Sequence, residues 1–363
     1  MAGQTIGRAA FAGGGTGGHV YMGVALGREL LRRNSSVEIL FVGTKRGMES
    51  RIIPKTPFQL ETLRLGGLNR VSLRTALQTL FQLPASLWFS RRILKRFRPD
   101  IVVGLGGYSS GPVVLCAHWM GLPTLAIEPN AVPGFANRRL ASRVGAAAVA
   151  FEETCRFFGD KCRVTGIPIR KDFFEIRSAP AAEGPLRILL FGGSQGSRPL
   201  NRLMREALPF LAPARFRIRH QAGAADLETV RTAYQEAGFE AEVHEFIDDM
   251  PRLFNWADLI VCRSGASSVA ELAAAGKASI LIPFPQAADD HQTRNAEAMA
   301  SRGAAVLLPQ NETDGKKLAE SISKLEMDRP RLREMAASSR RLARPDSTER
   351  ILGLMEELFE RSR

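Results

Sequence analysis

The sequence AGGGTGGH, residues 12–19, follows a short apolar run that ends at Phe11. A second glycine-rich sequence, FGGSQGS at residues 191–197, follows the apolar residues 188–190 in the other half of the chain. Each sequence is typical of a strand that ends in a tight glycine turn and leads into a helix. Free backbone N–H groups and the helix dipole at such a turn favour an anion such as a diphosphate. Two turns at matching places predict two nucleotide-type domains that face each other across a cleft.

Short apolar runs alternate with helical patterns throughout the chain. This alternation is typical of βαβ units with parallel sheets, so we expect an α/β protein with two Rossmann-like domains. The polar stretch after residues 166–170 predicts the domain boundary there, and Asp346 is the predicted N-cap of a last helix. The predicted strands are 6–11, 37–42, 101–104, 124–127 and 146–151 in the first half, and 188–191, 216–220, 243–247, 259–262, 280–283 and 305–308 in the second.

The composition narrows the possible partners. The chain has 50 Lys and Arg against 37 Asp and Glu, a net charge of +13, which favours nucleic acid, an anionic membrane or a phosphorylated substrate. Apolar runs are too short for a transmembrane helix. The four cysteines lack C-x-x-C spacing, and scattered single thiols are typical of a reducing cytosol. The sequence has no D-x-D-type metal motif, so we expect neither a metal nor a cofactor.

The first glycine turn matches the G-x-G-x-x-G pattern of dinucleotide-binding domains. Those domains also need an acidic residue at the end of the second strand, whereas here Glu38 lies at its beginning. This mismatch argues against a nicotinamide cofactor. The glycines alone would permit a tight turn, but that interpretation leaves Thr16 and His19 without a role.

The second half carries RSGASSVAEL at residues 263–272, directly after a predicted strand. A helix that starts here can bind a phosphate, and Glu271 can accept hydrogen bonds from a ribose diol. The alternative is that Ser268 is an N-cap with Glu271 as its capping-box partner. Downstream, the polar cluster at residues 289–295 suits a hydroxylated ligand or, alternatively, a solvated loop and helix start.

Six short motifs, spread in a fixed order over nearly the whole chain, resemble those of a known family. The chain resembles the peptidoglycan glycosyltransferases that move N-acetylglucosamine from UDP onto lipid I, making lipid II. The resemblance implies a GT-B-type enzyme with an inverting reaction. It also implies an acceptor domain over 1–166, completed by helix 346–363, and a UDP-sugar donor domain over 167–345. The motifs are residues 14–19, 106–112, 128–134, 192–197, 263–271 and 291–292.

The resemblance also implies site residues. For UDP-N-acetylglucosamine, Glu271 would take the ribose hydroxyls, the backbone of Ile247 would meet the uracil, and Ser194 would face the diphosphate. The remaining substrate-binding residues implied are Thr16, Gly17, Gly18, Asn130, Arg170, Ala266, Ser267, Ser268, Val269, Ala270 and Gln292. The acceptor diphosphate would meet Gly15, Gly107, Tyr108 and Ser109.

His19 is the predicted catalytic base. The acceptor is a sugar hydroxyl whose proton must leave, and a neutral imidazole can accept that proton near pH 7. Alternatively, His19 donates a hydrogen bond to the acceptor diphosphate or caps the turn. His291 is the other candidate base, on the sugar side.

No acidic residue occurs between Glu61 and Asp100. The apolar residues 73, 77, 80 and 81 lie on one helical face, and Pro84 is predicted to start a second helix. Such a face is often core, but the lack of acids favours an anionic lipid surface, where each basic residue contributes about 1 kcal/mol. Few aromatics argue against RNA. The predicted membrane residues are Arg91, Arg92, Lys95 and Arg96.

The predicted enzyme is thus a peripheral protein on the cytoplasmic face of the cell membrane. It would transfer N-acetylglucosamine to the C4 hydroxyl of the muramyl sugar of lipid I (undecaprenyl-diphospho-muramoyl-pentapeptide), without nucleic acid as a partner. Alternatives are a transferase with another lipid or small-molecule acceptor, a nucleotide-sugar epimerase, and a non-catalytic UDP-sugar sensor at the membrane.

Overall fold

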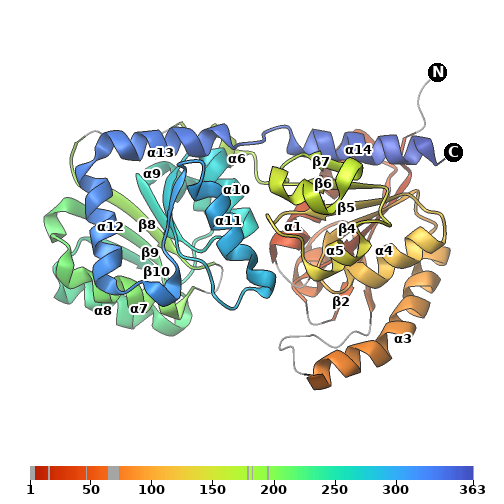
Figure 1. Cartoon of the computed structure of the whole chain (residues 1–363), viewed down its shortest axis with the longest axis horizontal. Helices are drawn as coiled ribbons and strands as arrows, with labels where there is room; N and C mark the ends of the chain where they lie inside the picture. The colour runs from red at the N-terminus through yellow and green to blue at the C-terminus, as the bar shows by residue number, and fades with distance from the viewer. Residues whose placement is uncertain are drawn as a thin grey trace. The chain divides into compact units, whose positions relative to one another are not determined.

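The chain folds into two compact units. In the computed structural model, which describes residues 5–14, 17–45, 47–63, 73–177, 180–181, 183–193 and 196–362, unit 1 comprises Met1–Ile169 with Asp346–Arg363, and unit 2 comprises Arg170–Pro345. Each unit is a parallel sheet covered by helices (Figure 1). None of the described helices is long and apolar enough to cross a bilayer.

Unit 1 contains a seven-stranded parallel sheet in the order β3-β2-β1-β4-β5-β6-β7. The central strands are buried on both faces, and residues 9–12 of β1 are fully buried, which explains their continuous apolar sequence. The strands are β1 (Arg8–Gly13), β2 (Glu38–Thr44), β3 (Gln59–Leu63), β4 (Ile101–Gly106), β5 (Thr124–Glu128), β6 (Ala146–Val149) and β7 (Cys162–Val164). The helices are α1 (Gly17–Arg33), α2 (Glu49–Ile52), α3 (Leu73–Phe97), α4 (Ser110–Trp119), α5 (Phe135–Leu140) and α14 (Ser347–Arg361).

The last helix, α14, belongs to unit 1. The Ser347 hydroxyl donates to the carbonyl of Ile167 at 3.0 Å, and Arg33 of α1 pairs with Glu356 at 3.5 Å. The N-cap residue is Asp346, as predicted, but its side chain makes no capping bond to the helix backbone and instead pairs with Arg350.

Unit 2 repeats the pattern with six parallel strands in the order β10-β9-β8-β11-β12-β13. The strands are β8 (Leu186–Phe191), β9 (Phe216–Gln221), β10 (Ala241–His244), β11 (Leu259–Cys262), β12 (Ala278–Leu281) and β13 (Ala305–Leu307). The helices are α6 (Asp172–Glu175), α7 (Arg198–Ala207), α8 (Leu227–Glu236), α9 (Met250–Trp256), α10 (Ala266–Ala275), α11 (His291–Ala300), α12 (Gly315–Met327) and α13 (Arg329–Arg341).

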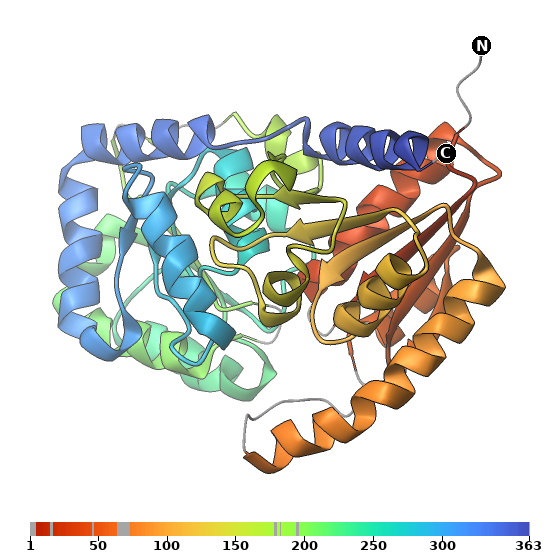
Figure 2. The same ribbon diagram turned by 45° about the vertical axis from the view of Figure 1, so that its right-hand side comes forward.

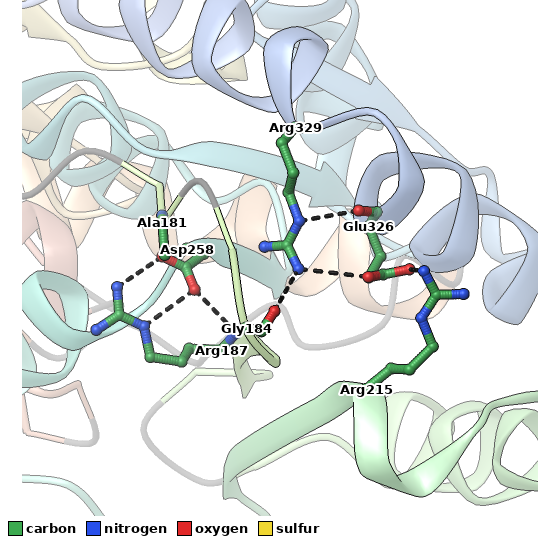
Figure 3. A network of polar contacts seen from close by, with 7 residues as sticks. All are labelled: Ala181, Gly184, Arg187, Arg215, Asp258, Glu326 and Arg329. Carbon is green, nitrogen blue, oxygen red and sulfur yellow. Dashed lines mark hydrogen bonds and ion pairs between the residues drawn. The ribbon is translucent and has the colours of Figure 1, made fainter.

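A polar network ties the start of unit 2 to the amino end of its sheet (Figure 3). Asp258, fully buried before β11, accepts hydrogen bonds from Arg187 Nε and Nη2 at 3.0 and 2.7 Å and from the N–H of Ala181 at 3.0 Å. Nearby, Arg329 donates to the carbonyl of Gly184 and contacts Glu326. The network lies at the edge opposite the glycine turn after β8, so its role is structural.

Two predictions about unit 1 are wrong. Pro84 does not start a helix but lies inside the single helix α3, where its exposed position leaves water to satisfy the backbone carbonyl that a proline cannot bond. The expectation of four single thiols fails as well, because Cys155 and Cys162 form a disulfide with their Cα atoms 5.2 Å apart. The short segment between β6 and β7 brings these two residues together, whereas Cys116 and Cys262 are buried free thiols.

Candidate functional site

The predicted acceptor residues gather at the carboxyl edge of the sheet of unit 1. The loops after β1, β4 and β5 are neighbours there because these strands are adjacent, and ligands of doubly wound sheets bind at this edge. The loop after β1 leads into α1 with Gly17, Gly18 and His19, the loop after β4 contains residues 107–109, and Asn130 follows β5. Gly15 and Thr16 lie outside the described residues.

The first two of these loops touch through their backbones. A Cβ atom on Gly107 would lie 2.6 Å from the carbonyl oxygen of Gly14, so only glycine permits this approach. The φ angle of Gly107 is also positive, at 81°. The His19 ring lies over the second loop, with Nε2 at 3.3 Å from the Cβ position of Gly106. His19 is therefore beside the turn that contains residues 107–109, of which Tyr108 is exposed and Ser109 buried.

Two buried carboxylates support these loops, and neither was among the predicted site residues. Glu49 lies beneath the first turn, where its Oε1 accepts from the N–H and hydroxyl of Thr44 at 2.7 and 2.9 Å. Its carboxylate fills the space beside Gly14. No local pattern signals this role, because the glycines and the carboxylate are more than 30 residues apart.

The second carboxylate, Glu128, positions the Asn130 loop. Its Oε1 accepts from the N–H and Nδ2 of Asn130, and its Oε2 accepts from Asn137 Nδ2, each at 3.0 Å. Burial raises the pKa of Glu128, and these hydrogen bonds oppose the rise. Thr154 completes the support by donating its hydroxyl to the carbonyls of Asn130 and Ala131.

In unit 2 the predicted donor residues also lie at the carboxyl edge of the sheet. Helix α10 begins at Ala266 directly after β11, with Gly265 as its N-cap. The alternative that Ser268 is the N-cap is therefore wrong. The N–H groups at residues 266–268, in the first turn, have no acceptor within the helix and can bind an anion, whereas the N–H of Val269 donates to the carbonyl of Gly265 at 3.0 Å. Ser194 lies outside the described residues.

Glu271 occupies the second turn of α10, with Ala270 beside it. Burial raises the pKa of the Glu271 carboxyl to about 7, although the charge of Arg170 opposes the rise. Arg170 stacks on the ring of Phe173, 5.1 Å from its centroid. Burial makes ionisation of the Glu271 carboxyl group unfavourable in the free protein. Hydrogen-bond donors of a bound ligand would stabilise the ionised form.

Arg263, just before α10, joins four loops at this edge. Its guanidinium donates to the carbonyls of Ile282 and Pro283 and to the side chains of Ser197 and Gln310, at 2.6–3.1 Å. Burial lowers its pKa to about 10, so it stays charged at neutral pH. In the sequence, Arg263 is recognisable only as part of the motif at residues 263–271.

Gln292 links two segments at the carboxyl edge of the sheet of unit 2. Its Oε1 accepts from the N–H of Phe284 at 3.0 Å, and its carbonyl accepts from the Ser264 hydroxyl at 2.7 Å. These bonds hold the loop after β12 against the start of α10. Within the described residues, no group of three or more His, Cys, Asp or Glu side chains is arranged to hold a metal ion.

The four predicted membrane residues lie on the C-terminal half of α3. Arg91 and Lys95 line a pocket of about 440 Å³ together with Cys116, Trp119 and Met120. Arg92 stacks on Trp88, while Arg96 forms an ion pair with Glu61. Trp88 and Trp119 are 58% and 63% exposed, so two large aromatic rings accompany the basic residues at the surface.

Two parallel sheets, each with helix starts at its carboxyl edge, are characteristic of the GT-B fold. The family model for the glycosyltransferase family 28 N-terminal domain matches residues 9–149, and that for the family 28 C-terminal domain matches residues 187–351. The chain belongs to glycosyltransferase family 28.

Two similar proteins from other bacteria carry the same name. The UDP-N-acetylglucosamine–N-acetylmuramyl-(pentapeptide) pyrophosphoryl-undecaprenol N-acetylglucosamine transferase of Myxococcus xanthus is 45% identical, over 96% of this chain and 92% of the relative. The protein of that name from Geobacter sulfurreducens is 43% identical, over 95% of this chain and 96% of the relative. Among solved structures, MurG of Acinetobacter baumannii superposes with a TM-score of 0.83 at 32% identity, covering 96% of this chain and 99% of that one.

Proposed function

We propose that the chain transfers N-acetylglucosamine from UDP-N-acetylglucosamine to lipid I, forming lipid II for peptidoglycan. It is a UDP-N-acetylglucosamine-dependent N-acetylglucosaminyltransferase. The observation that carries this function is the 45% identity to transferases of that name over 96% of the chain. The carboxyl edges of both sheets provide the chemistry that such substrates need.

Unit 2 is the proposed donor domain. Glu271 accepts hydrogen bonds from the ribose hydroxyls, the N-terminal turn of α10 binds the diphosphate, and the backbone at Ile247 binds uracil. Asn130 of unit 1 and Gln292 of unit 2 contact the sugar hydroxyls. Support comes from the positions of these residues of unit 2, which all follow strands at the carboxyl edge of one sheet, and from the burial of Glu271, whose unfavourable effect on ionisation a diol would offset.

Unit 1 is the proposed acceptor domain. The loops with Gly17, Gly18 and residues 107–109 bind the acceptor diphosphate, and His19 is the base. The C4 hydroxyl of the muramyl sugar attacks the anomeric carbon in line with the departing UDP, with inversion. His19 takes the hydroxyl proton as the new C–O bond forms and the bond to UDP breaks. Helix N–H groups stabilise the negative charge that develops on UDP.

A turnover assay tests the function. The purified protein is incubated with UDP-N-acetylglucosamine and lipid I, and lipid II and UDP are measured together. Equal amounts of the two products are expected. Release of UDP without lipid II, or turnover only with a different lipid acceptor, would contradict the proposed acceptor.

The protein is also proposed to bind the surface of an anionic membrane through α3. Support comes from Arg91, Arg92 and Lys95 on one helix and from the exposed rings of Trp88 and Trp119 beside them. Indole rings favour the membrane–water interface, and basic side chains are attracted to anionic headgroups. Figures 1 and 2 show the N-terminal half of α3 extending away from the sheet of its own unit.

A further inference from the structure

Gln221, the last residue of β9, joins two loops of the donor unit. It is 1% exposed. Its Nε2 donates to the carbonyl of Gly193 in the second glycine turn at 2.6 Å, and its Oε1 accepts from the N–H of Ile247 at 2.9 Å. We propose that Gln221 is a positioning residue that fixes the diphosphate turn and the uracil-binding loop relative to each other. This inference rests on the proposed donor function.

The first contact fixes Gly193 in the second glycine turn. The carbonyl of Gly193 also accepts from the N–H of Gly196 at 3.0 Å, so Gln221 completes the hydrogen bonding of one oxygen. Gly196 in turn lies directly on the end of β9, where an added Cβ atom would meet the carbonyl oxygen of Ala222 at 2.1 Å. Gly193 and Gly196 are therefore held by their contacts with residues 221 and 222.

The second contact fixes the peptide between Phe246 and Ile247. A hydrogen bond to the Ile247 N–H sets the direction of this planar group, and therefore the direction of the carbonyl on its other side. One carboxamide therefore hydrogen-bonds to both loops, as the donor to Gly193 and as the acceptor from Ile247. Only a side chain with a donor and an acceptor can serve a carbonyl and an N–H at once, which glutamine does and methionine or ionised glutamate does not.

Hydrogen bonds also hold the end of β9, so the backbone from which the Gln221 side chain extends is fixed. On the opposite face of the strand, His220 contacts the Tyr234 hydroxyl and Asn201 Oδ1, each at 3.0 Å. Asn201 Nδ2 donates to the carbonyl of Ala222 at 2.9 Å. Burial lowers the pKa of His220 to about 3, so these contacts do not change with pH in the neutral range.

The test compares the parent with Gln221→Met and Gln221→Glu. Methionine removes both contacts, whereas glutamate keeps an acceptor for the Ile247 N–H. Affinity is measured by calorimetric titration of UDP and by competition with uridine, an uncharged ligand on which the new carboxylate exerts little electrostatic effect. Gln235→Met, at an exposed position of α8, is the matched control.

We expect Gln221→Met to weaken UDP about tenfold, the effect of two ordinary hydrogen bonds, and to weaken uridine about threefold. Gln221→Glu should keep uridine affinity within about twofold of the parent. The KM for UDP-N-acetylglucosamine should rise in both variants, while kcat at saturating donor stays unchanged. A purely structural role would lower the amount of folded protein and kcat instead.

Three results would overturn the proposal. The first is parent-like UDP affinity in Gln221→Met. The second is an equal loss of uridine affinity in the Glu and Met variants, with parent-like thermal unfolding. The third is an unchanged KM for UDP-N-acetylglucosamine in Gln221→Glu. This result is decisive if Gln221→Met does not fold. Failure of the donor function itself is a different outcome, because the parent would then not bind UDP.

Discussion

Glu271 is the residue whose ionisation should control donor binding. Burial raises the pKa of its carboxyl to about 7, and the ionised form is the better acceptor for a ribose diol. Affinity for UDP-N-acetylglucosamine should therefore fall as the pH drops, by about tenfold from pH 8 to pH 6 if the protonated form does not bind. This ligand is suitable because its diphosphate, esterified at both ends, does not titrate in that range.

Calorimetric titration across this pH range checks the prediction. Glu271→Gln should bind weakly and with no pH dependence, while Glu236→Gln, exposed on α8, should behave as the parent. A pH-dependent affinity that persists in Glu271→Gln would mean that another group titrates.

His19 is the second residue at this scale, and its substitution can distinguish proton transfer from acceptor binding. If it is the base, His19→Ala should lower kcat by about 10²–10⁴, leave UDP affinity intact and remove the acidic limb of the pH profile of kcat. His118→Ala, exposed at the end of α4, is the control within the same unit. A rise in the KM for lipid I alone, with the acidic limb kept, would assign His19 to acceptor binding.

At the scale of the element, α3 is the proposed site of membrane association. Replacing Arg91, Arg92, Lys95 and Arg96 with glutamine should release the protein from liposomes that contain anionic lipid. Added salt should do the same for the parent, because surface charges are screened within about 8–10 Å. Donor affinity should not change.

Co-sedimentation measures this binding. A control variant with glutamine at four exposed arginines of unit 2, Arg202, Arg205, Arg331 and Arg333, has the same net charge. If both variants leave the liposomes equally, total charge rather than α3 governs binding, and the assignment to α3 is wrong.

At the scale of the whole molecule, the Asp258 network should make unit 2 sensitive to acid. Burial by itself raises the pKa of the Asp258 carboxyl, but hydrogen bonds from Arg187 and from backbone N–H groups outweigh burial and hold the pKa below its ordinary value. A lowered pKa in the folded state stabilises the protein above the ordinary pKa of about 4. This contribution is lost as the pH falls toward the folded-state pKa.

Asp258→Asn should therefore lower the free energy of unfolding of unit 2 by about 3 kcal/mol at pH 7, and by less at pH 3. Urea unfolding followed by Trp256 fluorescence, with Trp88 and Trp119 replaced by phenylalanine, isolates this unit. Glu240→Gln, which breaks the exposed pair with Arg217, should change it by less than about 1 kcal/mol. An Asp258 effect that is equal at both pH values would contradict the ionic explanation.

The sequence predicted the strands that lie in the middle of each sheet. β11 runs over Leu259–Cys262 as predicted, because a parallel strand buried on both faces must be continuously apolar. It missed β3 and β7, which are the edge strands of unit 1. β3 and β7 are only partly buried and lack a clear apolar run, whereas β10 and β13, the edge strands of unit 2, were predicted close to their observed positions.

The sequence by itself also determined the two glycine turns, the helix starts that follow them and, through six ordered motifs, the enzyme family. These features are local, because a turn and a helix start depend on consecutive residues. Only the tertiary structure decided which buried polar groups support them. Glu49, Glu128 and Gln221 acquire their roles from where the chain folds, and the partners of Gln221 are 28 and 26 residues away along the chain. A hydrogen bond between such distant segments leaves no periodic pattern in the sequence, so folding alone brings these partners together.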